Sequence, residues 1–367
     1  MRARVLTATP GGVAVTSDVE SPVPSGGWKW VDVAAEGAED DLLALAGPLR
    51  LDPLAVRDAV DERDLPKVDD FGHHLLVVLH GLRNDVIGTY EVDCFLTADH
   101  LVTVHSMPSP SIDALWEQVQ RRAELASGGP DELLGRLADI VSRRLLLVVD
   151  AFDERVEELT RMALAADARL VADLTAVRSD VATVRRVVHP QREALDQLRR
   201  TPSELVSDAG RRRFSDVFDV VARTAQGLDA ARSALSETLD AYRGAEARAA
   251  TEVTKLLTVY AAVILPLSLI AGIFGMNFPN LPGLDESWGW MVVITVMLAI
   301  AALSLGMFVA VGWIGQLRGR QAGAVLGRGL VEVSKTPIQL VGALFEVGAV
   351  PIRSTVGRLR EALPAED

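Results

Sequence analysis

Two long apolar runs stand out in the last third of the chain. No charged side chain occurs from Leu256 to Gly275 or from Trp288 to Gln316. Each run has about 20 residues or more, and at about 1.5 Å per helical residue that length crosses a hydrocarbon core of about 30 Å. The pattern therefore predicts two transmembrane helices, at 256–277 and 289–316, joined by an extracytoplasmic loop at 278–288.

The polar segment before the first run has a helical pattern of its own. No proline occurs between Pro202 and Pro266, and apolar residues return at every seventh position, at Phe214, Val221, Leu228, Leu235, Tyr242, Ala249, Leu256, Val263 and Ile270. This pattern predicts one helix from about Arg211 to Gly275, about 95 Å long, with a stalk at 203–255 as its first part. A persistent heptad indicates packing against other helices, and two spans per chain cannot enclose a pore, so we expect an oligomer.

The first 202 residues have the pattern of a mixed α+β domain. The β-branched runs "WKWVDV", "HHLLVVLHGL" and "YEVDCFLTADHLVTVHS" predict strands, and "DDLLALAGPLRLDPLAVRDAVD" predicts a helical stretch. We therefore expect an α/β domain at 1–128 and an antiparallel helical hairpin at 129–202, where no proline lies between Pro130 and Pro190. The expected fold is an α+β cytoplasmic domain followed by a long helical stalk and two transmembrane helices.

Charge predicts the orientation in the membrane. Arg248 and Lys255 precede the first span and three arginines follow the second, whereas only Asp285 and Glu286 lie between the spans. By the positive-inside rule, both termini are cytoplasmic in a multi-pass protein of the inner or plasma membrane. The N-terminal "MRARVLTATPGG" lacks the apolar core of a secretory signal.

The acid excess narrows the class of partner. The net charge is −13, and the excess lies in residues 1–255. Such a domain does not suit binding to nucleic acid or lying flat on anionic lipid. It suits a protein that handles cations, and equally an acidic soluble domain.

One side of the first predicted span is small, weakly polar and uncharged. Its members, spaced by three or four residues, are Thr254, Leu257, Thr258, Ala261, Leu265, Ser268, Gly272 and Gly275. A face of this kind serves either a pore lining or helix packing in lipid. Directly beyond it, Asn277 follows Gly275 and Met276. An amide at the end of an apolar run favours the pore.

Several stretches in this order resemble the CorA family of magnesium channels. They are "LDPLAVRDAVDERDLPKVDDFGHHLLVVLHGL", "FSDVFDVVARTAQGLDAARSALSETLDAYRG" and "TEVTKLLTVYAAVILPLSLIAGIFGMNF", the last ending in the family's hallmark, and the resemblance extends to about Gln316. It implies a homopentameric funnel in the lipid bilayer, with the first membrane helices lining the pore. The implied cargo is hydrated Mg²⁺, with Co²⁺ and Ni²⁺ as further candidates, moving down the electrochemical gradient without an organic cofactor.

The resemblance also implies a role for each lining position. From the mouth to the cytosol these positions are Asn277, Ser268, Leu265, Leu257, Thr254 and Thr251. Mg²⁺ holds its water tightly, so a ring of neutral Asn277 oxygens can bind the hydrated ion and still release it. Leu265 and Leu257 are the implied apolar constrictions. Thr254 stands where methionine is common in the family and Thr251 where asparagine is common, so we expect a more polar inner pore.

Carboxylates are implied for regulation and for the mouth. Asp85 and Asp216 match positions where family members bind cytosolic divalent ions between subunits and hold the channel shut, although each also fits a turn or a helix start. Pro279 and Gly283 stand where the family usually has acids, so only Asp285 and Glu286 are left to attract cations. Those two also fit a solvated loop.

Two alternative functions stay open. One is a zinc transporter of the related ZntB type, against which Met276 argues, and the other is a non-conducting scaffold or divalent sensor with the same fold. The sequence has no phosphate-binding glycine loop, Cys/His cluster or nucleophile motif, so no enzyme is expected.

We expect Cys94 to be a buried thiol, and His73 and His74 to be structural because neighbours in a strand face opposite ways. Residues 317–367 form a cytoplasmic extension beyond the resemblance, with an amphipathic segment or disorder as the expectation.

Overall fold

The computed structural model describes residues 2–35, 39–61, 64–83, 87–276 and 288–313. These residues group into two compact units, one ending at Ala241 and the other beginning at Tyr242. Several positions named from the sequence lie outside the described residues, as does the extension from residue 314 onward: Asp85, Asn277, Pro279, Gly283, Asp285 and Glu286.

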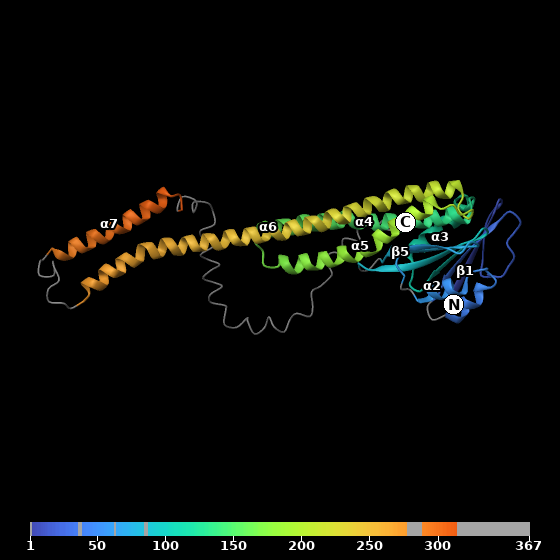
Figure 1. Ribbon diagram of the computed structural model, residues 1–367, viewed down its shortest axis with the longest axis horizontal. Coiled ribbons are helices and arrows are strands. Elements are labelled where there is room, and N and C mark those ends of the chain that lie inside the picture. The colour runs from blue at the N-terminus through green and yellow to red at the C-terminus, as the bar shows by residue number, and fades with distance from the viewer. Residues whose placement is uncertain (1, 36–38, 62–63, 84–86, 277–287, 314–367) are drawn as a thin grey trace. The chain divides into compact units, whose positions relative to one another are not determined.

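A mixed β-sheet forms the base of the first unit (Figure 1). Among the described residues its strands are β1 (Arg2–Thr9), β2 (Gly12–Thr16), β3 (Trp28–Ala34), β4 (Lys67–Asp70), β5 (Leu75–Leu82), β6 (Thr89–Leu96) and β7 (His100–His105). The strand order is β2-β1-β3-β7-β6-β5-β4. β3 and β7 pair in parallel, and the other neighbours pair antiparallel. The centre of the sheet is therefore formed by strands far apart in sequence.

The predicted strands are present with two differences. "YEVDCFLTADHLVTVHS" forms two strands, β6 and β7, because a tight turn closed by Thr97 N–H to His100 O at 2.9 Å reverses the chain. The hairpin of β1 and β2 was not predicted. Its turn needs Gly12, whose φ of 135° lies in a region that other residues rarely adopt.

Two helices, α1 (Glu39–Ala46) and α2 (Pro53–Asp61), cover one face of the sheet. Leu42 and Val56 from these helices pack with Val31, Phe95 and Val102 from the sheet in one apolar core. The predicted helical stretch is divided into these two helices. The chain leaves the helix after α1 in a turn closed by Leu51 N–H to Ala46 O at 2.8 Å, and then starts α2 at a proline.

Three further helices lie on the opposite face. They are α3 (Pro110–Arg121), α4 (Pro130–Leu164) and α5 (Leu170–Arg200), with a short 3₁₀ turn, η1 (Ala123–Ala126), after α3. α4 and α5 form the predicted helical hairpin, and they pack on β5 and β4 respectively. α5 continues through Pro190 to Arg200. Proline lacks the backbone N–H of a helical hydrogen bond, but the burial of Ala194, Leu195 and Leu198 stabilises the helix beyond this position.

The predicted long helix is α6 (Asp208–Phe274), with 67 residues and hence a length of about 100 Å. Its first turn is capped by Ser207, whose Oγ accepts from Gly210 N at 3.0 Å and donates to Asp131 at 2.6 Å. Figure 1 shows the first part of α6 beside α4 and α5.

The first four heptad positions of the stalk are buried inside the chain itself, whereas Tyr242 is half-buried and Ala249 is exposed. Phe214, Val221, Leu228 and Leu235 are at most 2% exposed. The hydroxyl oxygens of Thr160 on α4 and Thr238 on α6 are 3.0 Å apart, so the two helices are in contact up to this point. The helices that this heptad requires are thus α4 and α5 of the same chain, and this part of the pattern does not by itself call for an oligomer.

The second apolar helix, α7 (Gly289–Ala310), ends earlier than the predicted position 316. Gly312 has a φ of 78° and donates to Val309 O at 3.0 Å, and Trp313 N–H donates to Phe308 O at 2.9 Å. This is the Schellman arrangement, in which a glycine in the left-handed conformation closes a helix. The glycine therefore stops a helix that apolar character alone would extend.

Candidate functional site

The end of α6 and the whole of α7 have the properties of membrane-spanning helices. Of the described helices, these two are long and apolar enough to cross a bilayer. None of the most apolar stretch of α6 and only 6% of that of α7 is buried within the chain. Side chains such as Leu257 and Leu265, which are 64% and 70% exposed, require an apolar solvent or partner helices.

The predicted lining residues that the structure describes all lie on α6 and are exposed. They are Thr251, Thr254, Leu257, Leu265 and Ser268. Their spacing places them along one side of the helix over about five turns. The structure contains one copy of the chain, so it does not bring these side chains together around an axis.

The threonine hydroxyls on this face donate hydrogen bonds to backbone oxygens of the same helix. The hydroxyl of Thr251 donates to Ala247 O at 2.8 Å, that of Thr254 to Ala250 O at 2.9 Å and that of Thr258 to Thr254 O at 2.9 Å. Each hydroxyl proton is therefore committed to the helix. The oxygens keep lone pairs that can accept hydrogen bonds from water or contact a cation.

The helix ends where the predicted mouth begins. α6 ends at Phe274, Gly275 N–H donates to Ala271 O at 2.9 Å, and Met276 N–H donates to Ile273 O at 3.2 Å. A Cβ added at Gly275 would lie 2.9 Å from the Ala271 oxygen. A glycine at this position therefore lets the last turn tighten directly before Asn277.

The predicted regulatory and metal-binding residues are only partly visible. Asp216 is exposed on α6, and Asp85, its predicted partner, lies outside the described residues. Within the described part of the chain, no group of three or more His, Cys, Asp or Glu side chains could hold a metal ion. His73 and His74 precede β5 in a turn and are not part of a strand as predicted. The ring of His74 is buried and stacks on Phe71, with centroids 4.6 Å apart.

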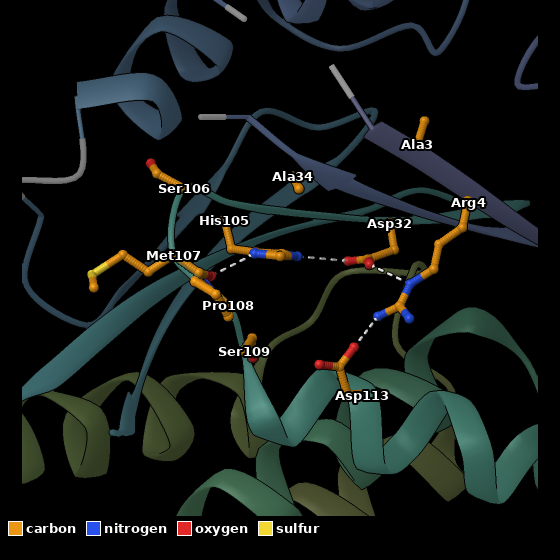
Figure 2. Close-up of a pocket in the computed structure, with 10 residues that line it drawn as sticks. All are labelled: Ala3, Arg4, Asp32, Ala34, His105, Ser106, Met107, Pro108, Ser109 and Asp113. Carbon is orange, nitrogen blue, oxygen red and sulfur yellow. Dashed lines mark hydrogen bonds and ion pairs between the residues drawn. The ribbon is translucent and has the colours of Figure 1, made fainter. Parts of the chain in front are cut away.

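A cluster of charged side chains that was not predicted from the sequence lies across β1, β3 and β7, on the face of the sheet toward α3. It consists of Arg4, Asp32, His105 and Asp113, and we call it the Asp32 corner; it lines a cavity of about 930 Å³ (Figure 2). Asp32 is 3% exposed. Its carboxylate accepts from Arg4 Nε at 2.8 Å and from Thr103 Oγ1 at 2.6 Å, and His105 Nε2 lies 3.4 Å away.

The corner shifts the pKa values of Asp32 and His105. Burial alone would raise the pKa of Asp32, but His105, Thr103 and Arg4 together hold it below its ordinary value. Burial likewise opposes protonation of His105, but the neighbouring Asp32 outweighs it and raises the pKa of the imidazole. One feature of the sequence indicates such a cluster, namely Asp32 within the strand "WKWVDV". A charge that is buried in a sheet requires a partner.

Comparisons with known proteins cover the segments of both apolar helices. The family described as "CorA-like Mg2+ transporter protein" matches residues 25–310. The cobalt/magnesium transport protein CorA of Thermotoga maritima is 26% identical over 308 residues, which cover 82% of this chain and 88% of that protein. The zinc transport protein ZntB of Yersinia enterocolitica is 24% identical over 270 residues, covering 68% and 78%.

A solved structure has the same fold. The complete structure of the CorA magnesium transporter from Methanocaldococcus jannaschii matches with a TM-score of 0.75 at 18% identity, over 85% of this chain and 99% of that one. The α+β unit, the long helix and the two apolar C-terminal helices are therefore common to both. Since the family match extends over most of its length, the chain belongs to the CorA-like Mg²⁺ transporter family of divalent-cation transporters.

Proposed function

We propose that the chain is the subunit of a homopentameric channel that passes hydrated Mg²⁺ down its electrochemical gradient, with Co²⁺ and Ni²⁺ as further candidate cargo. The observation that carries the proposal is the uncharged, exposed face of α6 that leads to Gly275 and Met276, with Asn277 next in the sequence. One chain offers one such face, and a closed ring of copies would turn it into a pore. The membrane potential supplies about 4.6 kcal/mol per 100 mV for a divalent ion.

Selection in this proposal takes place at Asn277, before the ion loses any water. Mg²⁺ prefers near-ideal octahedral coordination and dehydrates reluctantly. Amide oxygens accept hydrogen bonds from its water shell, and their neutrality lets the ion leave again. Asp285 and Glu286 of the same loop are the candidate groups that raise the local cation concentration.

The inner half of the pore is expected to be more polar than is usual for the family. The hydrogen bonds that Thr251 and Thr254 donate to the helix backbone support this proposal. Because the hydroxyl protons are used there, the lone pairs of the hydroxyl oxygens are left to face water or a hydrated cation. Leu257 and Leu265 are the proposed constrictions, which close by dewetting. Ser268 lies between these constrictions and the mouth.

The proposed gate is controlled by divalent ions at Asp85 and Asp216 of neighbouring subunits. The exposed position of Asp216 in the described structure suits an intersubunit site. Bringing two carboxylates together is unfavourable until a cation lies between them, so occupancy would favour the closed arrangement. The cytoplasmic position of both termini follows from the lysine and arginine distribution and is part of the proposal, as are the predicted domain boundaries.

The direct test is ion flux into liposomes that contain the purified full-length protein at fixed potential, with Mg²⁺ compared with Zn²⁺. Faster Mg²⁺ uptake supports the proposal. Preferential Zn²⁺ uptake would favour the second candidate, a zinc transporter, which the similarity to ZntB keeps open. Absence of both fluxes from well-incorporated protein would favour a non-conducting divalent sensor or scaffold.

A further inference from the structure

The Asp32 corner joins strands and a helix that are far apart in the sequence. The register places Arg4 opposite Asp32, Asp32 beside Thr103, and Thr103 opposite Cys94, on one row across β1, β3, β7 and β6. Arg4 also donates from Nη2 to Asp113 Oδ1 at 2.6 Å, which ties this row to α3. Its guanidinium lies 4.5 Å from the ring of Trp116 on the same helix.

His105 sits between two hydrogen-bond acceptors. Its Nδ1 lies 2.7 Å from Met107 O, and its Nε2 lies 3.4 Å from Asp32 Oδ1. A neutral imidazole has one N–H, so it would present a lone pair to one of these oxygens. Although the side chain borders the cavity, its Nε2 atom is buried, so Asp32 is the neighbour of this nitrogen in place of water. Only the doubly protonated ring directs an N–H toward both oxygens: Nδ1 makes a hydrogen bond to Met107 O, and Nε2 forms an ion pair with Asp32 at a separation that does not meet hydrogen-bond geometry.

The charges around His105 come from several elements. Asp32 of β3 and Arg4 of β1 act on the ring directly, and Asp113 of α3 binds the far side of Arg4. Asp93 of β6 pairs with Val104 and therefore lies on the other face of the sheet. In the described part of the chain, no charge of α2 or α4 is among the groups that act on the ring, although both helices pack on β7.

We propose that the Asp32 corner is a proton-operated latch, in which protonated His105 holds β7 and the start of α3 against β3 and β1, and loss of its proton loosens these contacts. The corner has two cations and two carboxylates when His105 is charged. Deprotonation leaves the corner with a net negative charge beside the buried carboxylate of Asp32 and abolishes the ion pair between the ring and Asp32. The proposal does not depend on which ion the membrane helices pass.

The pH range follows from the directions of the pKa shifts. The pKa of His105 is raised in the folded state, so its stabilising contribution is complete below the ordinary value of about 6.5 and is lost as the pH rises through the folded-state value. The pKa of Asp32 is lowered, so its contribution is present above about 3.8 and is lost only in acid. The latch is therefore closed at weakly acidic pH and opens on the alkaline side.

Cys94 provides a reporter inside the same row of residues. It is the single cysteine of the chain, and its side chain is fully buried. The experiment is to measure the rate at which a thiol reagent labels Cys94 in the full-length protein in detergent micelles, from pH 6 to pH 9. The reactivity of the thiol itself also changes with pH. Dividing the labelling rate of the folded protein by that of the denatured chain at the same pH removes this effect, and the quotient is the equilibrium constant for opening. We expect this constant to rise tenfold for each unit by which the folded-state pKa exceeds the open-state pKa.

Variants make the test specific. In His105→Gln the opening constant should be high and independent of pH, because the side chain is neutral throughout. His73→Gln, at an exposed histidine outside the corner, should keep the rise seen in the wild type. A flat profile in the wild type, or the same rise in His105→Gln, would overturn the proposal. If His105→Gln does not fold, Asp32→Asn takes its place in the experiment. A rise of the opening constant with pH as large in Asp32→Asn as in the wild type would also overturn the proposal.

Discussion

The backbone of Gly227 on α6 lies directly against the side chain of Val149 on α4. A Cβ added at Gly227 would be 2.4 Å from Cγ1 of Val149, closer than two carbon atoms can approach without a shift. A glycine inside a helix costs about 1 kcal/mol relative to alanine. The close packing of the stalk on the hairpin offsets this cost, so the glycine fixes how near the two helices lie.

We therefore predict that Gly227→Ala destabilises the first unit by about 1–3 kcal/mol through overpacking. The measurement is the thermal or urea-induced unfolding of the full-length protein in detergent. Gly244→Ala on the same helix is the matched control, because its added Cβ would meet only Arg248 Nη1 at 3.9 Å. The control should be unchanged or up to about 1 kcal/mol more stable. Equal behaviour of the two variants would contradict the close contact.

Periodicity explains which parts of the fold could be predicted. The two apolar runs and the heptad of α6 repeat over many residues, so element type and approximate length follow from them. The partner of the heptad could not be predicted in the same way. A repeat specifies that a helix is covered, but the hairpin of the same chain and a second copy would satisfy it equally.

The Asp32 corner could not be assembled from the sequence because it depends on sheet register. Arg4 lies on β1, which was not recognised as a strand, and Asp32 meets Thr103 through the parallel pairing of β3 with β7. Short strands with apolar residues on both faces do not reveal their register or order. The predicted site residues on α6, in contrast, needed only helical spacing to be placed on one face.

The proposed selectivity residue can be tested by removing its amide. We predict that Asn277→Ala lowers Mg²⁺ flux into liposomes at least tenfold, equivalent to about 1.4 kcal/mol, because the hydrated ion loses its first partners. The oligomer should stay intact on size-exclusion chromatography. Asn280→Ala removes another amide three residues further along and should have little effect. Wild-type flux in Asn277→Ala would remove this residue from the proposed mouth.

The proposed hydrophobic closure predicts a leak when its side chains are shortened. Leu257→Ala and Leu265→Ala should each raise Mg²⁺ leak severalfold at high cytosolic Mg²⁺, since a wider apolar constriction has a lower barrier to wetting. Leu256→Ala changes the adjacent residue, about 100° around the helix, and serves as the control. If the leak is unchanged in both test variants, closure takes place elsewhere, and Thr254 is the next position to vary.

The C-terminal extension is predicted to be dispensable for the channel. Removal of residues 323–367 should leave transport within about twofold of the wild type, because the proposed pore and stalk contacts precede residue 317. The measurements are liposome flux and the oligomer mass in detergent. Loss of the oligomer in the truncated protein would mean that the extension joins subunits, and loss of flux alone would mean that it affects the gate.

The proposed regulatory site links Asp85 and Asp216 of neighbouring subunits. If a bridging cation supplies the closing energy, a tenfold change in the ratio of open to closed channels requires only about 1.4 kcal/mol of differential affinity. Asp85→Asn combined with Asp216→Asn should therefore shift closure to higher cytosolic Mg²⁺ by about tenfold or more, without changing the preference for Mg²⁺ over Zn²⁺.

Closure of the channel with rising cytosolic Mg²⁺ can be followed by ion flux and by protease protection of the stalk in the same preparations. Asp219→Asn, at an exposed aspartate one turn along α6 from Asp216, controls for loss of charge from this surface. A shift in the double variant but not in Asp219→Asn assigns the sensing to the pair. Superimposable titrations of wild type and double variant would show that Asp85 and Asp216 are ordinary turn and helix residues, and that any sensing is performed by other carboxylates of the acidic domain.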